Sequence, residues 1–201
     1  TASDITAPNS TKGVISRNKI HAVYNDTTLL ITAIGCEGMT IDSNQLLGGI
    51  PSISILNSDS ISVKDNYFYH ESSSTTGAYP LGGVIDGKNI HLLRNEFVFA
   101  ESVTTFMTAL VRISAGASNL DGLRIESNTI SGGTGTGTRL VYFFGSTVSD
   151  ISLINNSSSH EQELFRFATL ADLSSVTFEN NRSLKNKNVE WSPAVSDTLL
   201  L

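Results

Sequence analysis

The sequence predicts an all-β fold in which short strands coil into a solenoid, and three observations support this prediction. A short pattern centred on an asparagine recurs seven times along the 201 residues, and segments rich in β-branched and aromatic residues separate the copies. No segment carries a sustained helical period, and we expect at most a short helix around 159–163. The clearest copy of the pattern is Ile125-Glu126-Ser127-Asn128-Thr129-Ile130.

The copies repeat at an irregular interval. Successive asparagines lie 26, 22, 29, 33, 28 and 25 residues apart, a period typical of repeat architectures. A solenoid of strands can lengthen individual loops freely, whereas helical-hairpin repeats tolerate less variation, so the irregular spacing favours strands. The seven asparagines are Asn18, Asn44, Asn66, Asn95, Asn128, Asn156 and Asn181.

Apolar residues occupy fixed places around each asparagine. The residue three before it is apolar in all seven copies, the residue five before it in six, and the residue two after it in five. The first two places are two residues apart, which is the period of a strand with one buried face. Each copy therefore predicts a short strand, a corner at the asparagine and the start of another strand. A second strand-like segment between copies, such as Ile53-Ser54-Ile55-Leu56, completes the repeat.

Two or three short strands in each repeat indicate a parallel β-helix, here of about seven coils. Coils stack at about 4.8 Å, so equivalent residues of neighbouring coils lie side by side. Asparagine tolerates the left-handed backbone conformation that a corner needs, and its amide can bond the backbone and the asparagines above and below. We therefore expect the seven asparagines to form an interior ladder with a structural role.

The composition of the chain excludes several classes of function and of binding site. The net charge of −6 argues against a nucleic-acid binder, which would carry a basic face. The single cysteine, Cys36, excludes an intrachain disulfide, and its apolar neighbours predict a small buried residue. No stretch approaches the roughly 18 apolar residues of a membrane span. The four histidines fit no metal-ligand spacing, so we expect no metal and no cofactor.

The chain divides into three parts. We expect a leading segment at 1–12, the β-helix at 13–188 and a C-terminal cap or tail at 189–201, where Trp191 would cover the last coil. The polar start has no initiator Met, which we interpret as a fragment that lacks its targeting or anchoring segment.

The asparagine-rich repeat resembles the coils of right-handed parallel β-helix proteins of the pectate-lyase-like superfamily, over about residues 13–190. The weakly charged texture, rich in Ser, Thr, Asn and Gly, is similar to the body of a bacteriophage tailspike. The resemblance implies a right-handed coil, a homotrimer, a virion or extracellular location, and bacterial surface polysaccharide as the partner. The paired Asp with Gly-His-Gly of polygalacturonases is missing, and so is the Asp-rich calcium cluster with a catalytic Arg of pectate lyases.

The segment at 67–80 interrupts the repeat and is the best candidate for a sugar-binding site, because function concentrates on irregular parts of a rigid scaffold. Exposed aromatic rings beside carboxylates offer a sugar a flat apolar face and hydrogen-bond acceptors. An ordinary hydrophobic loop edge is the alternative. Arg124 is a further candidate, because it should point outward beside His91. The candidate sugar-binding residues are therefore Tyr67, Tyr69, His70, Glu71, Tyr79 and Arg124.

Glycoside hydrolysis would need two carboxyl groups roughly 5–9.5 Å apart, which adjacent coils could supply. The candidate catalytic pairs are Asp65 with Glu96, and Asp86 with either Glu96 or Glu71. The chain holds 19 acidic residues, so such pairs also arise by chance on a solvated surface.

Three functions are compatible with these features. The first is a tailspike-like receptor-binding protein that recognises, and could degrade, bacterial surface polysaccharide. The second is a polysaccharide lyase or glycoside hydrolase acting as an endoglycosidase, and the third is a non-catalytic stalk or adhesin. Leu93 and Ile154 flank Glu126 on an outward row, an apolar pair that arises by chance or marks a surface covered by another subunit.

Overall fold

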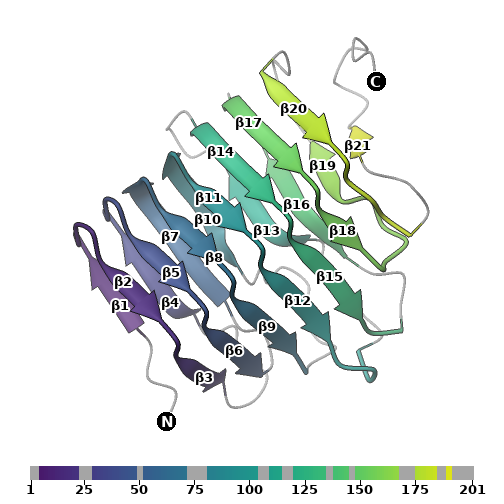
Figure 1. Cartoon of the computed structure of the whole chain (residues 1–201), viewed down its shortest axis with the longest axis horizontal. Coiled ribbons are helices and arrows are strands. Elements are labelled where there is room, and N and C mark those ends of the chain that lie inside the picture. The colour runs from purple at the N-terminus through teal and green to yellow at the C-terminus, as the bar shows by residue number, and fades with distance from the viewer. Residues whose placement is uncertain are drawn as a thin grey trace.

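The computed structural model shows a parallel β-solenoid (Figure 1). It describes residues 5–22, 29–48, 52–71, 81–103, 109–114, 120–134, 138–144, 148–167, 175–184 and 189–191. Within these ranges all strand pairs are parallel and no helix occurs, which confirms the all-β parallel β-helix, while the hand of the coil stays a prediction. The same part of the chain therefore offers no helix that could cross a membrane.

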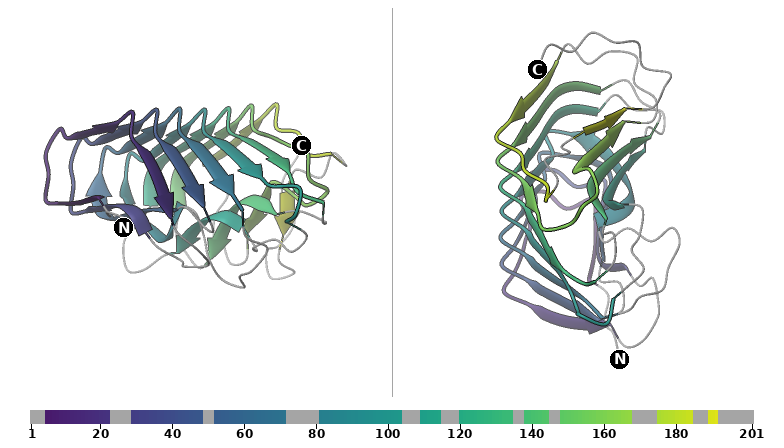
Figure 2. Two further views of the ribbon diagram at one scale, coloured as in Figure 1. Left: turned by 90° about the horizontal axis from the view of Figure 1, so that it is seen from below. Right: turned by 90° about the vertical axis from the view of Figure 1, so that its right-hand side faces the viewer.

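Each coil places its strands on up to three faces (Figure 2). The first face stacks β1 (Ile5–Pro8), β4 (Leu29–Ile34), β7 (Ser52–Asp59), β10 (Leu81–Lys88), β13 (Ala109–Ser114), β16 (Arg139–Phe144), β19 (Phe165–Phe167) and β21 (Val189–Trp191). The second face stacks β2 (Val14–Ser16), β5 (Thr40–Asp42), β8 (Ser62–Lys64), β11 (His91–Leu93), β14 (Leu120–Glu126), β17 (Val148–Ile154) and β20 (Val176–Glu179). The third face stacks β3 (Lys19–Ala22), β6 (Gln45–Gly48), β9 (Tyr67–His70), β12 (Glu96–Phe99), β15 (Thr129–Gly132) and β18 (Ser157–Ser158).

The solenoid makes about five turns, fewer than the seven coils expected. The six strands of the third face mark these turns, from β3 to β18. After the last asparagine copy, at Asn181, the described residues form a single bridge between Ser157 and Arg182 in place of a seventh third-face strand. Counting asparagines overestimates the turns for two reasons: seven corners bound only six intervals, and the last corner is not followed by a third-face strand among the described residues.

The core fills the space between the three faces. The residues three and five before the asparagine and two after it point inward, as the strand period predicts, and examples are Ile41, Val63 and Phe97, each 0% exposed. Cys36 is buried as predicted, and its thiol donates to the carbonyl of Ala7. Where the apolar pattern fails, at Ser158, the hydroxyl is still buried and accepts a hydrogen bond from the backbone N–H of His160.

The asparagines form the predicted ladder. The N–H and Nδ2 of Asn66 both donate to Oδ1 of Asn95, at 3.1 and 3.0 Å, and its Nδ2 also donates to the carbonyl of Ile41. Asn95 repeats this arrangement toward Asn128. The ladder runs unbroken through Asn18, Asn44, Asn66, Asn95, Asn128, Asn156 and Asn181.

The expectation that asparagine itself adopts the left-handed conformation is wrong. The residue before each ladder asparagine has positive φ instead, for example Ser43 at 54°, Arg94 at 50° and Ser127 at 56°. The preceding residue turns the chain so that the asparagine side chain points into the coil, where its amide can reach the next coil. The ladder position is therefore chosen for its side-chain amide rather than for its tolerance of a strained backbone.

Two further expectations concern the end of the chain. Residues 159–163 have irregular backbone, not the short helix expected. His160 explains this, because its buried ring accepts from the N–H of Thr138 and bonds the carbonyl of Gly132, which holds the chain against the preceding coil. Trp191 lies in β21, which extends the first face by one strand beside β19, and residues 192–201 of the expected cap lie outside the described residues.

Candidate functional site

Strand β9 presents two tyrosines on the outside of the third face. Tyr67 and Tyr69 point outward and are partly exposed, while Phe68 and His70 alternate with them and are buried. The inward rings stack on the next coil, Phe68 on Phe97 at 4.7 Å between ring centroids and His70 on Phe99 at 4.6 Å. The buried half of the strand thus fixes the backbone from which the two tyrosines project.

The two tyrosine rings are almost parallel. Their centroids lie 6.4 Å apart and their planes differ by 7°. Partial burial, and then the negative charge of Glu96 on the adjacent strand, raise the pKa of the Tyr67 phenol above its ordinary value. The Tyr67 hydroxyl is therefore protonated at neutral pH and available as a hydrogen-bond donor and acceptor.

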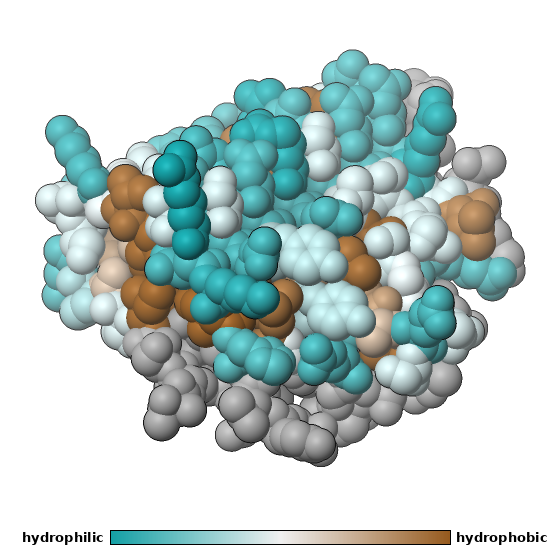
Figure 3. Space-filling view, turned by 60° about the horizontal axis from the view of Figure 1, so that its bottom comes forward, coloured by the Kyte–Doolittle hydropathy of each residue, from teal (hydrophilic) through white to brown (hydrophobic). Residues whose placement is uncertain are grey.

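Neighbouring coils extend the tyrosine pair into a small surface. Tyr67 lies in register between Gln45 and Glu96, and Tyr69 lies in register between Leu47 and Val98. All six side chains point outward on three adjacent strands, and on the view of this face brown and pale side chains gather among teal ones (Figure 3). We call this surface the tyrosine platform, consisting of Gln45, Leu47, Tyr67, Tyr69, Glu96 and Val98.

A glutamate and a histidine meet beside one side of the platform. Glu71 directly follows β9, and its carboxylate lies 3.8 Å from Nε2 of His21 in β3, two coils away. Their side chains are 50% and 57% exposed. Glu71 therefore lies at the end of β9, next to the platform, and faces His21.

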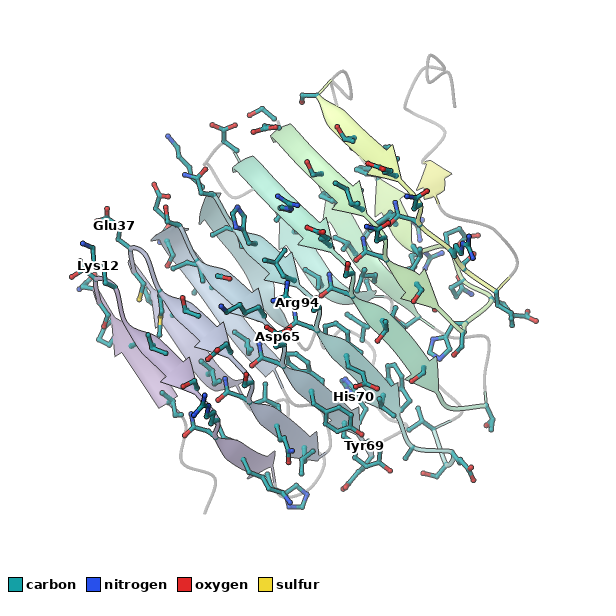
Figure 4. The ribbon with its side chains drawn as sticks, in the orientation of Figure 1. Lys12, Glu37, Asp65, Tyr69, His70 and Arg94 are labelled. Carbon is teal, nitrogen blue, oxygen red and sulfur yellow. The ribbon has the colours of Figure 1, made fainter. Side chains whose placement is uncertain are left out.

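His70 does not belong to any outer surface. It was expected to contact sugar, yet it is 0% exposed and points into the coil (Figure 4). Neither ring nitrogen has a hydrogen-bond partner in the described part of the chain. Burial lowers the pKa of this imidazole to about 3, so the ring is neutral at ordinary pH.

Asp65 forms an ion pair with Arg94 on the next coil. Nε and Nη2 of Arg94 donate to its two carboxylate oxygens at 2.7 and 2.8 Å, at the corner labelled in Figure 4. The hydrogen bonds from Arg94 hold the pKa of Asp65 below its ordinary value. A carboxylate held ionised by a bidentate arginine is poorly suited to donate a proton to a leaving group.

The remaining candidates that the structure describes lie on different faces. Glu96 lies on the platform beside Tyr67, whereas the backbone of Asp86 lies in β10 on the first face. The side chain of Asp86, and Tyr79 altogether, lie outside the described residues. Arg124 lies on the second face, where its guanidinium pairs with Glu126 at 2.6 Å, so it does not contribute to the platform.

Sequence reasoning missed Gln45, Leu47 and Val98, although a signal for them was present. The residue one after the ladder asparagine is Gln45, Tyr67 or Glu96 in three successive copies, and the residue three after it is Leu47, Tyr69 or Val98. Stacking in register brings equal offsets together, so aligning the copies beyond the core positions would have found both rows. Arg94 could have been found in the same way, since it and Asp65 both directly precede a ladder asparagine.

No cluster of three or more His, Cys, Asp or Glu side chains that could hold a metal occurs among the described residues. Comparison with protein-family models, with curated proteins and with solved structures found no match.

Proposed function

We propose that this protein binds a bacterial surface polysaccharide through the tyrosine platform. The observation that carries the proposal is the near-parallel pair of Tyr67 and Tyr69 on a flat outer sheet face, framed by polar groups. A sugar ring has an apolar C–H face and an edge of hydroxyls. Aromatic rings supply large apolar contact area, and nearby acceptors such as Glu96 fix the orientation of the hydroxyls.

The platform is rigid before any ligand arrives. Its side chains project from three paired strands rather than from loops, and the alternate residues of those strands are packed into the core. A preformed surface loses little conformational entropy on binding, which favours affinity for a repetitive polymer.

The described residues favour binding over cleavage. Hydrolysis of a glycosidic bond needs two suitably placed carboxyl groups. Of the candidate catalytic residues, Glu96 lies on the platform, while Asp65 is held by Arg94 at the corner. The lyase or hydrolase is thus the second candidate and would require a partner for Glu96 from elsewhere.

The same proposal includes a tailspike-like receptor-binding role, on a virion or outside the cell. The weakly charged repeat and its similarity to a tailspike body support this role.

A homotrimer would use a face other than the platform. On the second face Leu93 and Ile154 flank Glu126 in register, and both are partly exposed. Light scattering is expected to give about three times the 21.5 kDa of one chain, and a monomer would contradict the trimer without affecting the platform.

The proposal is tested with an array of bacterial capsular and lipopolysaccharide glycans. We expect binding to a subset, and a loss of at least about tenfold in affinity for Tyr69→Ala and for Tyr67→Ala, since each removes an aromatic contact worth about 1.5 kcal/mol or more. Tyr142→Ala on the first face is the matched control and should bind like the wild type. Absence of binding to any glycan, or equal losses in all three variants, would contradict the proposal.

Incubation of the same glycans with the protein separates the two candidate functions. Binding without new reducing ends or unsaturated products is expected. Products that disappear in Glu96→Gln would favour the enzyme instead.

A further inference from the structure

The tyrosine platform has two chemically different halves. Along the direction in which coils stack, Leu47, Tyr69 and Val98 form an apolar strip over three successive coils. Gln45, Tyr67 and Glu96 form a polar strip parallel to it. The strips are two residues apart along each strand, about 6.6 Å, which is comparable to the 6.4 Å between the tyrosine centroids.

The polar strip accepts and donates hydrogen bonds over its whole length. Gln45 and Glu96 are exposed on either side of Tyr67. An amide, a phenol and a carboxylate together can bond several hydroxyls of a sugar edge without requiring charge on the ligand.

In the apolar strip, the Tyr69 hydroxyl is the one side-chain group that can donate or accept a hydrogen bond. Leu47 and Val98 are partly exposed on both sides of Tyr69 and present only methyl groups. A hydroxyl placed against either side chain would lose its water without gaining a hydrogen bond, which is unfavourable. A methyl group placed there would instead gain from leaving water.

We infer that the bound polysaccharide carries methyl groups along one edge of its sugar rings, as N-acetyl groups or as 6-deoxy positions. The methyl edge lies on Leu47, Tyr69 and Val98, and the hydroxyl edge lies on Gln45, Tyr67 and Glu96. This inference rests on the proposed function, because it specifies the class of sugar that the same platform takes.

Two pairs of probes test the inference and separate the two sources of the methyl group. Chitohexaose and cellohexaose share a β-1,4 backbone and differ in the N-acetyl group, and L-fucose and L-galactose differ in the 6-hydroxyl. Titrations followed by NMR are expected to show at least one pair in which the methyl-bearing sugar binds about fourfold more tightly per contacting methyl. The pair that shows the preference identifies the source.

Variants of the apolar strip then test whether it causes the preference for the methyl-bearing sugar. Val98→Thr and Leu47→Thr place a hydroxyl on the strip and should reduce the preference, which is the ratio of the two affinities within a pair, to about one. Val14→Thr is the matched control, since it makes the same change at a valine that is 68% exposed on the second face, and it should keep the wild-type preference.

The outcomes are distinguishable from those of the glycan array. Equal affinities within both pairs, or a preference that survives in both strip variants, would overturn this inference and leave the proposed function standing. Failure of all four probes to bind would also overturn it, and the bacterial glycan array would then decide the proposed function separately.

Discussion

At the scale of single residues, Asn128 illustrates what the repeated asparagine does. Its Oδ1 accepts from both the N–H and the Nδ2 of Asn95, and its own Nδ2 donates to Leu92 and to Asn156. The side chain is 1% exposed, so water cannot replace these partners. The asparagine thus satisfies buried backbone groups at a corner where strand pairing is interrupted.

Asn128→Ala should destabilise the protein by about 3 kcal/mol or more, because it leaves two buried donors of Asn95 without an acceptor. Asn18→Ala is the control at the first coil, where no preceding asparagine donates to Oδ1, and it should cost about 1 kcal/mol. Urea unfolding of both variants measures the difference in the free energy of unfolding. Equal losses would contradict the ladder as the source of this stability.

His70 is a residue whose burial makes stability depend on pH. The folded state keeps its imidazole neutral down to about pH 3, whereas the unfolded chain takes up a proton near pH 6.5. The group therefore contributes stability above pH 6.5, and this contribution is lost as the pH falls from 6.5 toward 3, by about 1.4 kcal/mol for each pH unit.

His70→Phe should remove this dependence, because a phenyl ring can stack on Phe99 and does not titrate. The free energy of unfolding of the variant minus that of the wild type should rise steadily as the pH is lowered from 7 to 4. Phe68→Leu, at a buried ring of the same strand that does not titrate, should change the free energy of unfolding by the same amount at every pH. A difference between His70→Phe and the wild type that is independent of pH would contradict the account.

At the scale of elements, strand alternation predicted most of what lies inside the solenoid. The period of two placed Ile125 and Ile130 correctly on either side of the corner, and both are buried. The same period would have turned His70 inward, since it follows Tyr69, and the aromatic character of 67–71 obscured that signal. The pairing of Asp65 with Arg94 on the next coil was harder to predict, because a loop of irregular length separates them and only their shared place before a ladder asparagine links them.

Close approach between strands also selects glycine at one strand end. Gly132 ends β15 with φ of 83°, and an added Cβ would overlap the carbonyl oxygen of Phe99 on the adjacent coil. Gly132→Ala should therefore destabilise the protein by about 2–4 kcal/mol, from backbone strain and the displaced strand. Gly13→Ala, where the nearest heavy atom would lie at 3.8 Å, is the control and should change stability by less than about 1 kcal/mol. Thermal unfolding compares the two, and similar melting temperatures would contradict the close packing at Gly132.

At the scale of the whole molecule, the solenoid turns a short repeat into a flat, rigid outer face. Each coil contributes one outward pair of side chains to the third face, and stacking in register aligns these pairs into rows. The sequence predicted the scaffold, while the two rows of the platform depend on contacts between coils. The proposed binding of an extended polymer would use this geometry, because the platform spans three coils of the third face.

The most direct measurement is a crystal structure of the protein soaked with chitohexaose or with an oligosaccharide that the glycan array identifies. Our account predicts sugar density on the outer third face, with ring faces on Tyr67 and Tyr69, methyl groups toward Leu47 and Val98, and hydroxyls toward Gln45 and Glu96. Sugar bound at another face, with the tyrosine platform left in contact with solvent only, would contradict it.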